Sequence, residues 1–186
     1  MRNPIRIILM ASLASLSTLL LSSCSLAGEI MNNSPLFKSD ASIANERFEQ
    51  ILDACQKQDA TALKEMFSEK AISDAANFDD SITALFDFFQ GEVTTYENVC
   101  GGPKVEQANN EDGTNRKWKK MSSSYDFETN EQKYRLAFEE YVVDTANADN
   151  IGIYSLYIIK AEDSKTEFAY WGGWEFNPGI VIEKKD

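Results

Sequence analysis

The stretch Met121–Val143, MSSSYDFETNEQKYRLAFEEYVV, decides the fold class of this sequence. On both sides of a polar turn, apolar, aromatic or small residues recur with a period of two: Met121, Ser123, Tyr125 and Phe127, then Tyr134, Leu136, Phe138 and, beyond Glu140, Val142. A period of two is typical of strands that bury one face. The stretch therefore predicts two successive strands, with Tyr141 and Val143 on the face opposite to the second set.

A third strand is expected at Ile151–Ile159, which is almost continuously apolar and rich in β-formers. Such a run is typical of a central strand that is covered on both faces. The segments 106–116 and 144–150 are polar and contain several asparagine and aspartate residues. We therefore expect both segments to be hairpin loops.

The residues before Glu92 have a helical period instead. One helix face collects the apolar side chains of Ala44, Phe48, Ile51, Leu52 and Cys55. Asp40 or Ser42 is available to cap this helix at its start. The pattern predicts one amphipathic helix near the beginning of the domain.

Shorter helices are expected next. Asp59 would cap a helix that carries Leu63, Met66 and Phe67, and the segment 70–75 adds another turn. Asn77 would begin a further helix that stops at Gly91, with an apolar face of Phe78, Ile82, Leu85, Phe86 and Phe89. Helices followed by strands favour an α+β fold, in which N-terminal helices pack on one face of an antiparallel sheet.

The first 23 residues have the pattern of a signal peptide. Arg2 and Arg6 supply positive charge, and the apolar run 7–21 is shorter than the about 20 residues that span a bilayer. The stretch Leu21-Ser22-Ser23-Cys24 then resembles the lipobox of bacterial lipoproteins. This resemblance implies cleavage before Cys24 and a diacylglyceryl group on its thiol. The alternative is a plain secretory peptide with an incidental cysteine.

Three segments follow from this reading. Residues 1–23 are the signal peptide, residues 24–39 a lipid-anchored tether rich in turn-forming residues, and residues 40–186 a single α+β domain. Two or more acyl chains anchor a protein stably. Lipid on Cys24 would therefore hold the domain at the cell membrane, facing outside the cytoplasm.

Composition excludes several classes of function. The chain has 18 basic and 30 acidic residues, a net charge of −12, so nucleic acid is not expected as a partner. It contains no histidine, which removes histidine general bases, Ser-His and Cys-His pairs and most zinc sites. We expect neither a cofactor nor a metal.

Two cysteines remain beside Cys24. An exported location permits a disulfide between Cys55 and Cys100. However, Cys55 falls on the apolar face of a predicted helix, which favours a buried free thiol.

Basic residues flank Trp118 at Lys104, Arg116, Lys117, Lys119 and Lys120. These residues either balance the charge of neighbouring strands or dock an acidic partner.

The helical opening is similar to the start of nuclear-transport-factor-2-like (cystatin-like) domains. The similarity runs from Ile51-Leu52-Asp53-Ala54 through Asp59 to Leu63-Lys64-Glu65-Met66-Phe67, and the order of elements extends it over residues 40–183. It implies a cone in which helices pack against a strongly curved antiparallel sheet, often with a pocket at the wide end. Such domains often pair through the sheet, so we expect a monomer or a homodimer.

Nearly the whole domain also resembles a family of uncharacterised small lipoproteins of Gram-positive bacteria, a domain of unknown function. The residues that carry this resemblance are Leu85-Phe86-Asp87-Phe88-Phe89-Gln90-Gly91, Tyr154-Ser155-Leu156-Tyr157, Lys160-Ala161-Glu162-Asp163, Tyr170-Trp171-Gly172-Gly173-Trp174 and Pro178-Gly179-Ile180. It supports fold and location and implies no site residues.

Aromatic side chains supply the candidate ligand-binding residues. Trp171 and Trp174 lie in the densest aromatic patch, which either lines a pocket or fills the core of a curved sheet. Tyr125, Tyr141 and Tyr157 would give a pocket its convergent hydroxyl groups, or would pack as half-buried strand residues. These five residues form the predicted binding site.

Two carboxylates are candidates for catalysis. Glu139 and Glu140 are neighbours in a predicted strand and must point to opposite faces. An acid that entered an apolar cavity would have a raised pKa and would suit a general base, whereas a solvated position at a strand edge accounts for most acidic residues of this sequence.

The run 144–150 lacks the glycine and terminal glutamate of an EF-hand loop, which favours a solvated hairpin over a calcium site.

The resulting expectation is a non-catalytic extracytoplasmic module that binds a small ligand or an envelope protein. One alternative is an isomerase- or cyclase-like enzyme that uses a buried carboxylate with a tyrosine partner. Another alternative is an immunity-type interaction protein that protects its own cell from a secreted toxin.

Overall fold

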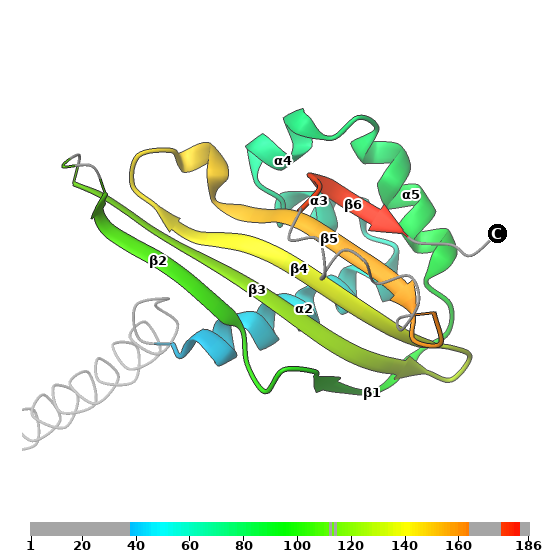
Figure 1. Cartoon of the computed structure of the whole chain (residues 1–186). Coiled ribbons are helices and arrows are strands. Elements are labelled where there is room, and N and C mark those ends of the chain that lie inside the picture. The colour runs from blue at the N-terminus through cyan, green and yellow to red at the C-terminus, as the bar shows by residue number, and fades with distance from the viewer. Residues whose placement is uncertain (1–37, 112, 114, 164–175, 183–186) are drawn as a thin grey trace, which may run out of the picture. The chain divides into compact units, whose positions relative to one another are not determined.

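The computed structural model describes residues 38–111, 113, 115–163 and 176–182. Within these residues the helices come first and the strands follow, so the predicted α+β order is confirmed. Figure 1 shows the helices gathered on one side of the sheet. Residues from Asp40 onward form one compact unit.

The described helices are α2 (Asp40–Lys57), α3 (Ala60–Glu65), α4 (Glu69–Asp74) and α5 (Phe78–Phe88). The predicted apolar face of α2 is buried along its whole length. Asp59 caps α3 as predicted, since its carboxylate accepts a hydrogen bond from the Ala62 amide at 2.9 Å. Ser68 caps α4 in the same way through the Ala71 amide at 3.0 Å.

The predicted stop of α5 at Gly91 is wrong, because the helix already ends at Phe88. Gly91 lies in the turn into the first strand with a φ of 83°, where a Cβ would clash with the side chain of Asn130. The glycine is therefore needed for a close approach of two turns and not for helix termination. Tyr134 caps the C-terminal end of α5, since its hydroxyl donates a hydrogen bond to the Phe88 carbonyl oxygen at 2.9 Å.

The described strands are β1 (Val93–Asn98), β2 (Lys104–Glu111), β3 (Arg116–Thr129), β4 (Lys133–Asp144), β5 (Gly152–Lys160) and β6 (Gly179–Ile182). Their order is β1-β3-β4-β5-β6, and β2 pairs with β3 on the same edge as β1. All pairs are antiparallel except β5 with β6, which are parallel. The prediction of a purely antiparallel sheet is wrong, because β6 runs in the same direction as β5, from Gly179 opposite Ser155 to Ile182 opposite Ile158.

The hairpin loop predicted at 106–116 is also too long. Most of that segment belongs to β2, which pairs with β3 from Lys104 opposite Ser122 to Glu111 opposite Arg116. This strand lies at the edge of the sheet, where polar and charged residues are common, so its composition resembles that of a loop. The segment 144–150 does connect two strands as predicted, with a short 3₁₀-helix at Ala148–Asn150.

The core lies between the helices and one face of the sheet. Phe48 of α2 stacks on Tyr125 of β3 with ring centroids 4.1 Å apart, and Phe127 stacks on Tyr134 of β4 at 5.1 Å. Both alternating sets of the stretch Met121–Val143, up to Phe138, belong to this buried face.

Cys55 lies in the same core, and burial raises the pKa of its thiol to about 12. It is a free thiol, as is the exposed Cys100, so the unpaired alternative is confirmed.

At Gly152, a side chain would collide with the backbone of the α3–α4 connection. Its φ is 117°, and a Cβ would lie 2.9 Å from both the Met66 carbonyl oxygen and the Ser68 amide nitrogen. The neighbouring Ile153 hydrogen-bonds to both of those residues, which holds the α3–α4 connection against β5. Gly152→Ala is therefore expected to lower the free energy of unfolding by about 2–3 kcal/mol in urea denaturation of the full chain.

Gly101 provides the matched control for this prediction. It also has a positive φ, of 74°, but a Cβ there would have no heavy atom within 4 Å. Gly101→Ala therefore reports backbone strain alone and should cost less. Equal losses in the two variants would show that the close contact at Gly152 contributes nothing.

Several predicted features lie outside the described residues: Cys24, the signal peptide, most of the tether, Trp171 and Trp174. The predictions made for them stay predictions. Within the described ranges, no helix is long and apolar enough to cross a membrane.

Candidate functional site on the open sheet face

Polar side chains are buried on the sheet face that points away from the helices, which we call the open face. No described helix lies across this face in Figure 1. Its buried polar residues are Ser122, Ser124, Glu139, Ser155 and Tyr157. Buried polar groups are more informative than buried apolar ones, because they are usually inside a protein only when they are paired.

Lys120 and Glu139 form the centre of this group. In the register of β3 against β4, Lys120 lies opposite Tyr141 and Ser122 lies opposite Glu139, so Lys120 and Glu139 are diagonal neighbours. The Glu139 Oε2 atom accepts hydrogen bonds from Lys120 Nζ at 3.1 Å and from Ser122 Oγ at 3.2 Å. The residue is only 4% exposed.

The ion pair continues toward the edge of the sheet. Lys120 Nζ lies 3.5 Å from Glu106 Oε2 on β2, and Glu106 Oε1 lies 2.8 Å from Lys104 Nζ. Charges of alternating sign therefore cross three strands. We call Lys104, Glu106, Lys120 and Glu139 the charge ladder.

Burial decides the electrostatics at the inner end of the charge ladder. It raises the pKa of Glu139, and the opposing effects of Lys120 and Ser122 do not cancel it. Burial acts to lower the pKa of Lys120, but Glu139, Glu106 and Tyr141 together outweigh it, so that pKa is raised. The carboxylate loses more water than the ammonium, since the two side chains are 6% and 20% exposed. The site therefore holds the Lys120 ammonium, whose pKa is raised, beside the Glu139 carboxyl group, which takes up a proton more readily than an ordinary glutamate.

Aromatic residues border the charge ladder. Tyr157 of β5 packs in a small cluster with Ala137, Ile159 and Val181 on the open face. Tyr141 is half-buried beside Trp118, with ring centroids 6.3 Å apart. The Phe176 ring centroid lies 5.9 Å from Lys120 Nζ, within the range of a cation–π contact.

The structure separates Tyr125 from the other predicted tyrosines. Tyr125 is fully buried on the helix-facing side of the sheet, where its hydroxyl donates to Asn45 Oδ1 at 2.7 Å. Tyr141 and Tyr157 both belong to the open face. Tyr125 therefore does not join them in one site within the described structure.

Glu140 points to the face opposite Glu139, as predicted from strand geometry. It is 0% exposed, and its Oε2 atom accepts a hydrogen bond from Arg47 Nε of α2 at 2.9 Å. Burial raises its pKa, and Arg47 opposes that shift. Among the described residues, Glu140 Oε1 and Ser123 Oγ are buried without a hydrogen-bond partner. This acid therefore has the environment of a general base or acid.

The first carboxylate of the loop 144–150, that of Asp144, has a structural role. Asp144 accepts two hydrogen bonds from Arg116, at 3.2 and 2.7 Å, and one from Asn150 Nδ2 at 2.8 Å. The amides of Ala146 and Asn147 also donate to it, and together these donors hold its pKa well below the ordinary value. Within the described ranges, no three His, Cys, Asp or Glu side chains are grouped to hold a metal ion.

A protein-family model described as a domain of unknown function, DUF5104, matches residues 50–161. The chain belongs to the DUF5104 family. The matched part of the DUF5104 protein contains strands β1 to β5 and therefore the whole charge ladder and Glu140. Arg47 and β6 lie outside it. No curated protein matches the sequence.

In the DUF5104 domain, the basic cluster around Trp118 balances charge between neighbouring elements. Arg116 pairs with Asp144, Lys119 with Asp40, and Lys120 with Glu139 and Glu106. The structure thus supports the first of the two readings of this cluster. The cations and Glu139 are each visible in the sequence, but the pairing of Lys120 with Glu139 depends on the register between β3 and β4, which the pattern of neither strand gives.

The raised pKa of Glu140 predicts a pH-dependent stability difference. Between about pH 4.5, its unfolded value, and its higher folded pKa, the folded DUF5104 chain holds a proton that the unfolded chain has released. This residue's contribution to stability therefore falls as pH rises through that window. Glu140→Gln should gain stability relative to the wild type over the same range, by at most about 1.4 kcal/mol per pH unit. Urea denaturation at stepped pH measures the difference, and a constant difference would contradict the prediction.

Proposed function

We propose that this DUF5104 protein is a lipoprotein that is anchored through diacylglyceryl-Cys24 and faces outside the cytoplasm. The support is the sequence pattern of residues 1–24, with its positive start, short apolar run and lipobox-like end. The resemblance to small lipoproteins of Gram-positive bacteria supports the same location. On this proposal residues 24–39 are the tether and the domain begins at about residue 40.

We further propose that the domain is a non-catalytic module that binds a small polar ligand or an envelope partner on the open face. The observation that carries this proposal is the Lys120–Glu139 pair, buried beside Tyr157 and Phe176 where no described helix covers the sheet. Such a site offers a cation, a carboxylate and aromatic surface together, which suits a ligand with both polar and apolar groups. Trp171 and Trp174 are proposed to add stacking surface.

The fold proposed for this module is the nuclear-transport-factor-2-like cone, as a monomer or a homodimer. The order of helices before strands, and the packing of α2 across β3, agree with that architecture. The parallel strand β6 is an addition that the resemblance does not predict.

The anchor is tested by growing the host with a labelled fatty acid. The wild-type protein is expected to carry the label, and Cys24→Ala is expected to lose it and to leave the membrane fraction. Label retained on Cys24→Ala would exclude this residue as the anchor.

The ligand site is tested by native mass spectrometry of the full chain, purified gently from the envelope of its host. We expect a reproducible added mass that is lost from the double variant Lys120→Met/Glu139→Gln. The matched control is Lys133→Met/Glu128→Gln, which removes a more exposed cross-strand ion pair between the same two strands. An added mass that survives both variants would exclude the charge ladder as the site, and an added protein chain would support the interaction alternative.

The isomerase- or cyclase-like alternative rests on Glu140. Its complete burial, raised pKa and unpaired oxygen are the observations in its favour. Carboxyl-resolved NMR titration separates the alternatives, because an acid–base catalyst must titrate near the working pH. An ordinary titration of Glu140 would exclude the enzyme reading.

A further inference from the structure

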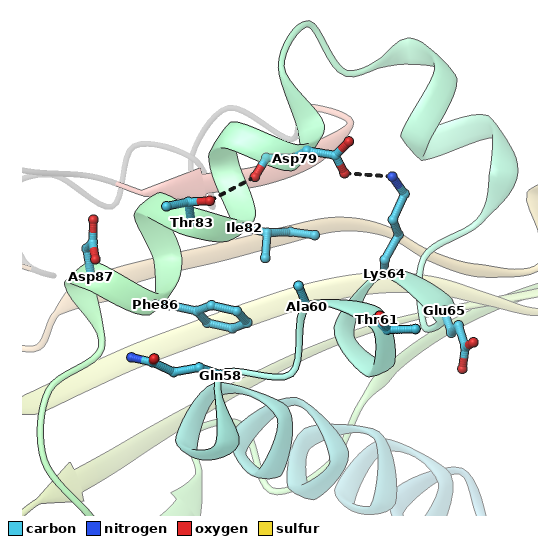
Figure 2. Close-up of a pocket in the computed structure, with 10 residues that line it drawn as sticks. All are labelled: Gln58, Ala60, Thr61, Lys64, Glu65, Asp79, Ile82, Thr83, Phe86 and Asp87. Atoms are coloured by element: carbon cyan, nitrogen blue, oxygen red, sulfur yellow. Dashed lines mark hydrogen bonds and ion pairs between the residues drawn. The ribbon is translucent and has the colours of Figure 1, made fainter.

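A groove lies between α3 and α5, on the far side of α5 from β6. It has a volume of about 570 Å³, within the range of ligand-binding clefts. Figure 2 shows its lining side chains, which come from the α2–α3 turn, from α3 and from α5. The lining residues are Gln58, Ala60, Thr61, Lys64, Glu65, Asp79, Ile82, Thr83, Phe86 and Asp87.

The middle of the groove is apolar. Ile82 and Phe86 project from α5 toward Ala60 on the opposite wall (Figure 2). Ile82 is buried, whereas Phe86 is only half-buried and packs against the core from its edge. A half-exposed aromatic ring in a concave surface favours contact with an apolar side chain of another molecule.

The charges of the groove are unequal. Its one cation, Lys64, is already neutralised, since its Nζ atom lies 2.6 Å from Asp79 Oδ1. Figure 2 shows Asp87 at one end of the groove and Glu65 at the other. Both carboxylates are exposed, and neither makes a side-chain hydrogen bond or ion pair with any described residue. The groove thus presents an apolar centre between two unpaired negative charges.

We propose that this groove binds an extended segment of a partner polypeptide in which apolar residues are flanked by lysine or arginine. The apolar side chains would lie over Phe86 and Ile82, and the flanking cations would reach Asp87 and Glu65. The net charge of −12 over the whole chain attracts such a segment and repels an acidic one. The groove is independent of the open-face site, so this proposal does not rest on the ligand site proposed above; only the nanodisc setting of its test rests on the proposed lipid anchor.

The test uses the full chain in nanodiscs of zwitterionic lipid and two fluorescein-labelled peptides with the cores Lys-Leu-Leu-Lys and Glu-Leu-Leu-Glu. Fluorescence anisotropy is expected to show binding of the basic peptide, with empty nanodiscs as the blank. Glu65→Gln/Asp87→Asn is expected to weaken that binding about fivefold. Thr83→Lys, which places a new cation at an exposed position inside the groove, is expected to abolish it.

The matched control is Asp80→Asn/Glu92→Gln, which removes the same net charge from exposed positions outside the groove lining. Binding should be nearly unchanged in this control, and the urea midpoints of all variants show that each remains folded. The proposal is overturned if the basic peptide does not bind, if the acidic peptide binds as well, or if the control weakens binding equally. It is also overturned if deletion of residues 183–186 strengthens binding, because Lys184 and Lys185 would then be the native occupant.

Discussion

Replacing Phe48 with alanine is expected to lower the free energy of unfolding by about 3–5 kcal/mol, the usual loss for a fully buried phenylalanine. Phe48 is 0% exposed and contacts three aromatic rings of the sheet. It stacks on Tyr125 at 4.1 Å and meets Tyr96 and Phe127 edge-on at 5.1 and 6.0 Å. Truncation therefore opens a cavity where α2 meets β3.

The measurement is urea denaturation of the full chain, followed by fluorescence and far-UV circular dichroism. Gln56→Ala is the control, because Gln56 lies on the exposed side of the same helix. Glutamine and alanine both have high helix propensity, so this substitution should change the helix little. Phe48→Leu should recover part of the loss, because leucine refills some of the cavity. A loss at Phe48→Ala no larger than at Gln56→Ala would mean that α2 is not docked on the sheet as described.

Features that depend on short-range periodicity were predictable. The burial of Phe48 follows from the helical spacing of its neighbours, and the burial of Tyr125, Tyr134 and Phe138 follows from strand alternation. The opposite directions of Glu139 and Glu140 follow from the same alternation. Each of these predictions needs only a few residues of sequence, because local geometry fixes the direction of each side chain.

Features that depend on distant pairing were not predictable in this way. The strand β2 is polar because it lies at an edge, so its sequence resembles a loop. The parallel pairing of β6 with β5 is a relation between two strands that no local pattern shows. For the same reason, Arg47 was not recognised as the partner of Glu140, 93 residues away.

The candidate site and the groove also depend on contacts between residues that are distant in the sequence. Lys120 and Glu139 are each visible as charges in the sequence, but the register of β3 against β4 makes them diagonal neighbours. The groove is formed by α3 and α5, whose exposed residues are ordinary for surface helices when read separately. Its unpaired carboxylates become informative only when Asp87 and Glu65 are seen at two ends of one apolar surface (Figure 2).

The Arg47–Glu140 ion pair gives the second large expected effect. Arg47→Met keeps most of the aliphatic stem but removes the only described cation that hydrogen-bonds to Glu140, whose side chain is 1% exposed. An uncompensated buried charge typically costs about 3–5 kcal/mol. We expect a loss near the lower end of that range at pH 8, because Arg47 is itself 25% exposed and Glu140 can take up a proton.

Two further measurements identify the buried carboxylate as the cause of that loss. As pH falls toward 5, Glu140 becomes protonated more readily in the variant than in the wild type, so the loss in urea denaturation should shrink. The double variant Arg47→Met/Glu140→Gln should recover most of the lost stability at pH 8, because it leaves no buried charge without a partner. The matched control is Lys57→Met, which breaks an exposed ion pair on the same helix and should change little. If the double variant were no more stable than Arg47→Met alone, the loss would have to come from packing of the arginine stem, and the charge of Glu140 would not limit the stability of the fold.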